Sequence, residues 1–133
     1  MVRPAIAQVV GPLREIVGSV NLLTSASERP VYECDGFVVE KNSPDVVVFP
    51  TSTDQVARIV ATCNAADIPF LPRGAGTSLA GGCLPVGGGV MIVLTRMKEI
   101  LEINLRDQYA VVQPGVVNVW LTQALKGSGY HYA

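Results

Sequence analysis

Apolar residues follow two different patterns along the first 50 residues of the chain, a helical spacing and then a continuous run. Helical spacing near the start predicts a helix that ends at Gly18, with a break or restart at Gly11-Pro12. Its apolar positions are Ile6, Val9, Val10, Leu13, Ile16 and Val17. Residues 19–43 are less regular, which predicts loops and short turns over the surface. Residues 46–49 are a continuous β-branched and aromatic run, which predicts a buried strand.

The next segment returns to helical spacing. Ser52, followed three residues later by Gln55, has the pattern of a capping box. The helix is expected to run to about residue 66, with Val56, Ile59, Val60 and Cys63 on its apolar face. Residues 68–71 then predict a second strand. Together these elements predict a parallel, right-handed β-α-β unit.

The second half of the chain predicts further strands and one more helix. A third strand is expected at residues 90–94, and a hairpin from strands at 100–104 and 109–113 joined by a turn. The last helix is marked by Val117, Trp120, Leu121, Ala124 and Leu125, and it ends at Gly127 or Gly129. We expect Trp120 in the core. The predicted fold is α+β, with one small mixed sheet and flanking helices.

Glycine is concentrated in residues 71–89, which hold more than half of the chain's thirteen glycines. Such clustering costs conformational entropy and indicates positive φ angles or close approach to a ligand. Successive backbone N–H groups in a loop of this kind form a nest that suits a phosphate. The window also contains Leu79, Ala80, Cys83, Leu84 and Val86, which favour a packed loop over a flexible linker.

Two common phosphate-binding patterns do not fit this window. Gly82 and Cys83 stand where the P-loop requires Lys and then Ser or Thr, and Leu79 stands where the Rossmann fingerprint requires its third glycine. The only charge in the window is Arg73. These features favour a diphosphate held by backbone amides and by the hydroxyls of Thr77 and Ser78. A wide glycine-rich turn or a flexible surface loop remains the alternative.

Residues 72–82, Pro-Arg-Gly-Ala-Gly-Thr-Ser-Leu-Ala-Gly-Gly, resemble the flavin diphosphate loop of FAD-linked oxidases of the vanillyl-alcohol oxidase and p-cresol methylhydroxylase type. Within that superfamily the sequence is most similar to the D-lactate dehydrogenase and glycolate oxidase FAD-binding subunits. Three other segments resemble the family in the same order: residues 44–56, 95–97 and 110–116. The resemblance extends from about residue 22 to the last residue.

The resemblance implies FAD as cofactor and oxidation of a 2-hydroxy acid such as glycolate or D-lactate. The residues that it assigns to the cofactor are Pro72, Arg73, Gly74, Ala75, Gly76, Thr77, Ser78, Gly81, Gly82, Pro114 and Gly115. Pro72 would set the entry to the loop, residues 74–76 would offer amides, and residues 77–78 would offer hydroxyls. Gly81 and Gly82 would shape the loop, and the Pro114-Gly115 pair is a weaker candidate for lining the cofactor.

Two of these residues carry particular expectations. Arg73 would either contribute charge to the site or pair with an acid outside it. Thr77 occupies the place where some family members tether the flavin through a histidine. Because threonine cannot form that bond, the resemblance implies non-covalent FAD.

A length of 133 residues allows one domain at most. We therefore expect an N-terminal helix and irregular wrap in residues 1–43, and the first lobe of a PCMH-type FAD-binding domain in residues 44–133. The second lobe and the substrate domain are expected to be absent, so no catalytic residue is assigned, and the hydroxy acid would bind only to a complete enzyme. Asp35, Asp45 and Asp67 are interpreted as turn or cap residues. The alternative function is a non-catalytic module, either a weak nucleotide binder or an assembly partner.

Composition narrows the classes of partner and location. The formal charge is −1 with no cluster of basic residues, which disfavours nucleic acid. The chain is 49% hydrophobic, yet its apolar runs are too short for a transmembrane helix, and residues 1–8 lack the apolar core of a secretory signal. We expect a cytoplasmic chain, with peripheral membrane association through other oxidase subunits as a second option. Some of the apolar residues are expected to lie on a surface that the missing lobe would cover.

The cysteine pattern agrees with a reducing compartment. Cys34, Cys63 and Cys83 form no C-x-x-C motif and have no histidines at zinc-ligand spacing, so no metal site is expected. Cys63 is expected in the core, and Cys83 is expected to be a small buried residue beside the glycine loop. The lone His131 is not expected to act as a ligand or base.

Overall fold

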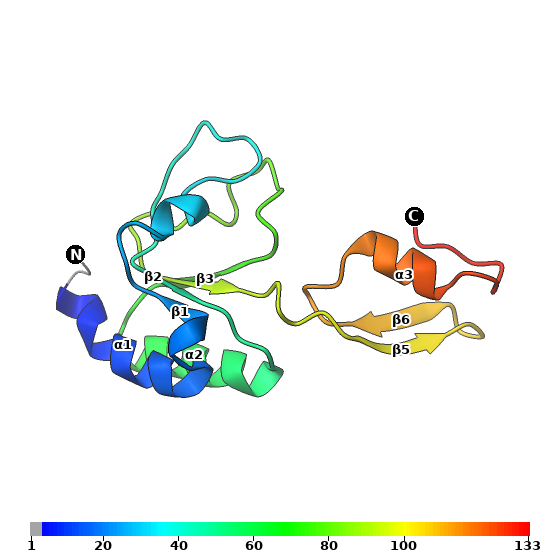
Figure 1. Cartoon of the computed structure of the whole chain (residues 1–133), viewed down its shortest axis with the longest axis horizontal. Coiled ribbons are helices and arrows are strands. Elements are labelled where there is room, and N and C mark those ends of the chain that lie inside the picture. Colours follow the sequence, from blue (N-terminus) through cyan, green and yellow to red (C-terminus); the bar gives the residue numbers. More distant parts are fainter. Residues whose placement is uncertain (1–3) are drawn as a thin grey trace.

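The larger part of the molecule is a four-stranded sheet with two helices on one face (Figure 1). The computed structural model describes residues 4–133. Residues 1–3 lie outside the described residues. They belong to residues 1–8, which the sequence predicts not to be a secretory signal. Helices α1 (Pro4–Val17) and α2 (Thr53–Ala65) lie side by side beneath the sheet, and short 3₁₀ turns, η1 (Ser19–Asn21) and η2 (Arg29–Tyr32), lie in the irregular segment.

The sheet is mixed, in the order β1-β2-β4-β3. Its strands are β1 (Leu22–Leu23), β2 (Val46–Val48), β3 (Phe70–Arg73) and β4 (Val90–Val93). β2 and β3 both run parallel to β4, whereas β1 is antiparallel to β2. The strands of the predicted β-α-β unit are therefore parallel, but β4 lies between them. The sequence pattern did not reveal β1.

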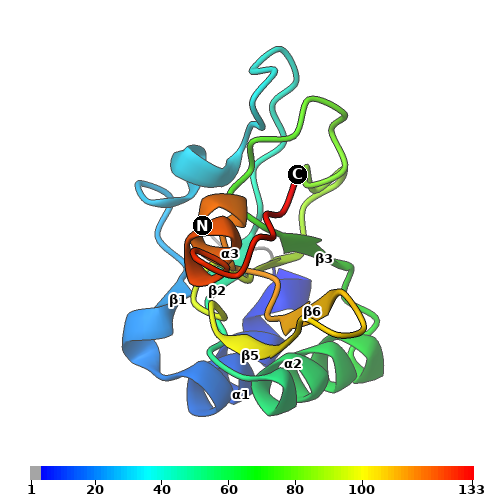
Figure 2. The ribbon, with the colours of Figure 1, turned by 90° about the vertical axis from the view of Figure 1, so that its right-hand side faces the viewer.

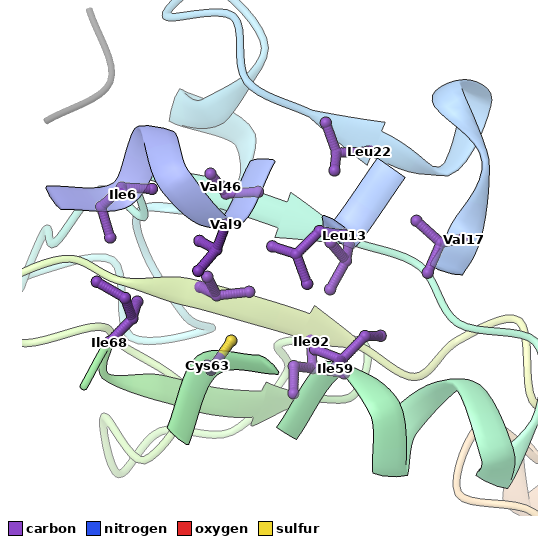
Figure 3. Close-up of a cluster of buried hydrophobic side chains, with 12 residues drawn as sticks. Ile6, Val9, Leu13, Val17, Leu22, Val46, Ile59, Cys63, Ile68 and Ile92 are labelled. Atoms are coloured by element: carbon purple, nitrogen blue, oxygen red, sulfur yellow. The ribbon is translucent and has the colours of Figure 1, made fainter. Parts of the chain in front are cut away.

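The central strands are buried on both faces, which explains their continuous apolar sequences. Val46, Val48, Val90 and Ile92 face the two helices, where they form a core with side chains from α1 and α2 (Figure 3). The helical contributions to this core are Ile6, Val9, Leu13, Val17, Ile59 and Cys63. Val47, Met91 and Val93 form a smaller cluster with Leu23, Tyr32, Phe49 and Leu71. Cys63 is fully buried, as predicted.

The predicted break in α1 is wrong, because the helix continues through Gly11 and Pro12. A proline inside a helix removes one hydrogen bond and costs about 3 kcal/mol. Four buried aliphatic side chains on one face offset this cost, since each contributes roughly 1.5–3 kcal/mol. The helix ends as predicted at Gly18, which has a φ of 81° and donates its N–H to the carbonyl of Arg14 at 2.8 Å.

Helix α2 begins at a side-chain cap. The Ser52 hydroxyl accepts the N–H of Gln55 at 3.2 Å, as the capping box predicts. The side-chain Oε1 atom of Gln55 accepts the N–H of Thr51 at 2.8 Å, one residue earlier than in the usual box. β3 begins two residues later than predicted, because the Ile68 N–H still bonds to the helix end at the carbonyl of Cys63.

The remaining elements form a second region, defined here as residues 100–132 and called the hairpin region. It contains β5 (Ile100–Asn104), β6 (Tyr109–Val112) and α3 (Asn118–Ala124), close to their predicted positions. β5 and β6 pair only with each other in the described structure, so a small antiparallel sheet accompanies the predicted mixed sheet. The region extends away from the larger sheet in Figure 1 and faces the viewer in Figure 2. Trp120 is 39% exposed rather than in the core.

Candidate functional site

The glycine-rich loop begins at the carboxyl edge of the parallel strands. Arg73 is level with Val93, so the chain leaves β3 and β4 at the same edge. The carboxyl edge of parallel strands is where open α/β sheets bind ligands. Pro72 and Arg73 are the last residues of β3, although they were expected to belong to the loop. Pro72 is tolerated there because β3 is an edge strand.

The glycine window divides into two parts with different positions. Gly87, Gly88 and Gly89 precede β4 and therefore lie at the opposite, amino edge of the sheet. Gly89 has a φ of 100° and donates its N–H to the Asp45 carboxylate at 2.7 Å. A Cβ at Gly89 would lie 2.2 Å from the Pro69 carbonyl oxygen. This second part therefore supports the fold, and only residues 74–82 remain as a candidate site.

Residues 74–79 present unbonded backbone amides. Within residues 4–133, none of the N–H groups from Gly74 to Leu79 donates a hydrogen bond to the protein, whereas the amides of Ala80 and Gly81 both do. Five of these six residues are exposed, and Gly76 is half-buried. The expectation of a packed loop holds only for the later residues Cys83 and Leu84, which are buried. Six successive amides thus have no hydrogen-bond partner in the described protein, as an anion-binding loop requires.

The Arg73 guanidinium lies against Gly76, within this run of amides. Its side chain is buried, and a Cβ at Gly76 would come within 1.9 Å of its Nη2 atom, so any larger residue there would have to displace the guanidinium. Gly76 also has a φ of 75°. The guanidinium donates to the carbonyl of Cys34 at 2.9 Å and to the Cys83 sulfur at 3.3 Å. The described residues include no carboxylate that forms an ion pair with Arg73. Its printed hydrogen bonds are thus to uncharged acceptors.

A segment far away in sequence holds the other side of the loop. The N–H of Gly36 donates to the carbonyl of Ser78 at 2.9 Å, and the Asp35 carboxylate accepts the N–H of Gly81 at 2.9 Å. The two segments lie side by side in both views (Figures 1 and 2). Backbone N–H groups, first that of Phe37 and then that of Gly81, lower the pKa of Asp35 despite its burial. We interpreted Asp35-Gly36 only as a turn, because no local pattern reveals a partner about 45 residues away.

Pro114 and Gly115 are held at the same edge of the sheet but not against the loop. Gly115 donates its N–H to the carbonyl of Met97 at 2.7 Å, and a Cβ there would lie 2.6 Å from the Leu94 carbonyl oxygen. Leu94 in turn donates its N–H to the carbonyl of Arg73. In residues 4–133, no hydrogen bond joins the Pro114-Gly115 pair to residues 72–82. Gly115 is therefore required for packing on the segment that follows β4.

Other chemistry is sparse in the part of the chain that the structure describes. It contains no group of three or more histidine, cysteine, aspartate or glutamate residues that could hold a metal ion.

Burial raises the pKa of the Cys63 thiol to about 11, so this thiol is inert at neutral pH. His131 lines a cavity of about 210 Å³ between the hairpin and α3. No helix among residues 4–133 has the length and apolar character needed to cross a bilayer.

Comparisons with known proteins identify the family to which the chain is similar. Residues 44–133 match the sequence model of a family described as FAD binding domain. The chain is 42% identical over 125 residues to the glycolate oxidase subunit GlcD of Escherichia coli K12, covering 94% of this chain and 25% of that protein. It is 37% identical over 124 residues to a D-lactate dehydrogenase of Anaerostipes hadrus, covering 92% and 25%.

A solved structure shares the arrangement of the elements. Substrate-bound p-cresol methylhydroxylase superposes with a TM-score of 0.83 at 26% identity, covering 95% of this chain and 25% of that one. The α+β fold with its small mixed sheet and flanking helices is thus that of the PCMH type. The chain spans about a quarter of the length of these proteins.

Proposed function

This chain belongs to the FAD binding domain family, and we propose that its residues 72–82 hold the diphosphate of FAD. The observation that carries the proposal is the run of six unbonded amides beside a buried arginine that forms no ion pair within the described residues. A diphosphate needs several hydrogen-bond donors and a compensating positive charge, and both are present here. The absence of a Cβ at Gly76 lets the backbone lie directly against the guanidinium.

We assign the individual contacts by residue type. Gly74, Ala75 and Gly76 would offer amides, and the exposed Thr77 and Ser78 would add their hydroxyls. Arg73 would act through its charge from behind the loop, because its donors already bond to Cys34 and Cys83. Pro72, Gly81 and Gly82 would shape the ends of the loop. The Pro114-Gly115 pair stays a weaker candidate, supported by its position at the same edge of the sheet.

We further propose that FAD is bound without a covalent link, since Thr77 lacks the nucleophilic nitrogen of histidine. When bound, FAD would accept the electrons removed from a substrate carbon. The residues of this chain would contribute binding and orientation of the diphosphate. We assign no catalytic residue to the chain.

The reaction that we propose for the complete protein is oxidation of a 2-hydroxy acid such as glycolate or D-lactate. Support comes from the names of the relatives, a glycolate oxidase subunit and a D-lactate dehydrogenase. Because the chain spans about a quarter of their length, the groups that bind and activate the substrate would lie in sequence beyond the described residues. The 133-residue chain alone is expected to bind FAD but not to turn over substrate.

The partners proposed for the complete protein are FAD, the small hydroxy acid and other oxidase subunits. Other oxidase subunits are proposed because one relative is named as a subunit of glycolate oxidase. We propose a cytoplasmic location, with membrane association only through such subunits. The free thiols of all three cysteines favour a reducing compartment.

A non-catalytic assembly module is the second candidate function. The observation that favours it is the exposed apolar surface of the hairpin region, which includes Leu101, Val111, Val119 and Trp120. Such a surface suits contact with further polypeptide whether or not FAD is bound.

The diphosphate site can be tested by titrating the purified chain with FAD and following flavin fluorescence. We expect Gly76→Ala to weaken FAD binding by roughly tenfold or more, because the new Cβ would displace the Arg73 guanidinium or the loop from their present contact. The matched control is Gly129→Ala, since Gly129 has a similar φ of 83° but open space around its Cβ position.

Two outcomes separate the candidate functions. FAD binding that Gly76→Ala weakens and Gly129→Ala does not would support the diphosphate site. A wild-type chain that is folded by circular dichroism but binds no FAD would contradict it and leave the assembly module. Acid precipitation of the loaded chain tests the non-covalent link, because free flavin should then appear in the supernatant.

A further inference from the structure

Residues 33–42 form a closed loop, called here the strap. Its ends are tied together by the N–H of Asn42, which donates to the carbonyl of Glu33 at 2.7 Å, and by an ion pair of 3.2 Å between Lys41 and Glu33. Inside the strap, Val38 donates its N–H to the carbonyl of Asp35 at 3.4 Å. The strap is therefore held in shape by its own bonds, which lets it act as a support for a neighbouring segment.

The strap contacts the glycine loop at three successive points. The carbonyl of Cys34 accepts from Arg73, at the start of the loop. The N–H of Gly36 donates to the carbonyl of Ser78, in the middle. The carboxylate of Asp35 accepts from Gly81, near the end. Because the contacts are spread along the loop, they fix its path as well as its position.

Asp35 connects the two segments with separate oxygen atoms. Its Oδ1 accepts the N–H of Phe37 within the strap, and its Oδ2 accepts the N–H of Gly81 in the loop, both at 2.9 Å. The side chain is only 5% exposed. An ionised carboxylate accepts at both oxygens, whereas an asparagine amide accepts at one and presents an N–H₂ group at the other. An asparagine here would place one donor against another.

We propose that Asp35 is a positioning residue for the diphosphate loop, acting on the amides of residues 74–79 through Gly81. The contacts at Ser78 and Gly81 lie at the two sides of Leu79 and hold the loop with its preceding amides unbonded. A loop fixed before the ligand arrives loses less conformational freedom on binding. This inference rests on the proposed function, because the ligand of these amides is taken to be the FAD diphosphate.

The test compares Asp35→Asn and Asp35→Glu with the control Asp67→Asn in the full 133-residue chain. Asp67 is exposed and has a φ of 52°, which asparagine tolerates, so the control removes the same charge away from the loop. We expect Asp35→Asn to weaken FAD binding about tenfold and to speed hydrogen exchange at the Gly81 amide. Asp35→Glu retains two acceptor oxygens and should recover part of both properties.

The order of the two Asp35 variants distinguishes positioning from mere packing. If only side-chain shape mattered, the near-isosteric asparagine would bind FAD better than glutamate, and that order would overturn the proposal. Unchanged FAD affinity in Asp35→Asn would also overturn it. If Asp35→Asn does not fold, Gly36→Ala carries the test, because its Cβ would lie 3.0 Å from the Thr77 carbonyl oxygen and push the strap from the loop.

Hydrogen exchange needs no ligand. The exchange rate of the Gly81 amide therefore tests its bond to Asp35 even if the wild-type chain binds no FAD. In that case the proposed function fails while the Gly81 amide still reports on Asp35. Unchanged exchange at Gly81 in both Asp35→Asn and Gly36→Ala would overturn the proposal. Faster exchange without any FAD binding in the wild type would overturn its functional part.

Discussion

β4 and β6 are both short apolar strands, yet they have different surroundings. β4, Val-Met-Ile-Val, is fully buried between two neighbouring strands, with helices on one face and a second cluster on the other. β6, Tyr-Ala-Val-Val, has one neighbour and contains no buried residue. The difference lies in what covers each strand, because the two sequences are similarly apolar. The candidate site follows β3 in the larger sheet, where the ends of the strands are fixed by packing.

The larger region, residues 4–94, therefore supplies most of the stability of the chain. The hairpin region contains a single buried residue, Leu121, within the described structure. An isolated two-stranded hairpin is marginally stable in water. Substitution, hydrogen exchange and acid pH should therefore affect the two regions differently.

Truncating a core leucine should distinguish the two regions most strongly. Leu13 is fully buried against the sheet (Figure 3), so Leu13→Ala should lower the free energy of unfolding by about 3 kcal/mol through lost burial and a cavity. Leu101 in β5 is 58% exposed, and Leu101→Ala should cost less than about 0.5 kcal/mol. Urea unfolding measures both. Equal losses would contradict the contrast between the regions.

Native-state hydrogen exchange should show the same contrast without substitution. Amides of β4 are expected to open only with the whole domain, whereas amides of β6 should open locally. We expect β6 amides to exchange faster by a factor of about 30 or more, after correction for intrinsic rates, which corresponds to about 2 kcal/mol. Uniform protection in both strands would show that the hairpin region folds cooperatively with the larger sheet.

The smallest of the three effects concerns acid pH. Folding lowers the pKa of Asp35 below its ordinary value of 3.8, so the stability that it contributes is present above that value. This contribution is lost as the pH falls through the lowered pKa of the folded state. The gap in unfolding free energy between wild type and Asp35→Asn should therefore be constant near neutral pH and narrow at acid pH. A gap that persists at the most acid pH would contradict the assignment.

Much of the secondary structure was predictable from sequence because each element carried its own pattern. The β-branched runs indicated β2 and β4, the Ser52 and Gln55 pair indicated the start of α2, and Gly18 indicated the end of α1. The break at Pro12 was predicted wrongly, since burial of one helix face outweighs the local cost of proline. The burial of Trp120 was also predicted wrongly, because helical spacing identifies an apolar face but not what covers it.

The candidate site was predictable in part. The glycines between residues 74 and 82 pointed to an anion-binding loop, but Gly87–Gly89 belonged to the same window and lie at the other edge of the sheet. The support from Asp35 and Gly36 had no local pattern at all. Hydrogen bonds between distant segments depend on the path of the chain, which periodicity does not encode.

The sequence by itself determined the elements, the family and the glycine loop, because these depend on neighbouring residues and on short motifs. The tertiary structure alone decided that β4 enters between β2 and β3, that Arg73 lies buried against Gly76, and that the strap is hydrogen-bonded to the loop. Each of these required segments far apart in the chain to be brought within bonding distance. The physical reason is that burial and hydrogen bonding are satisfied by the whole fold, whereas local preferences act only over a few residues.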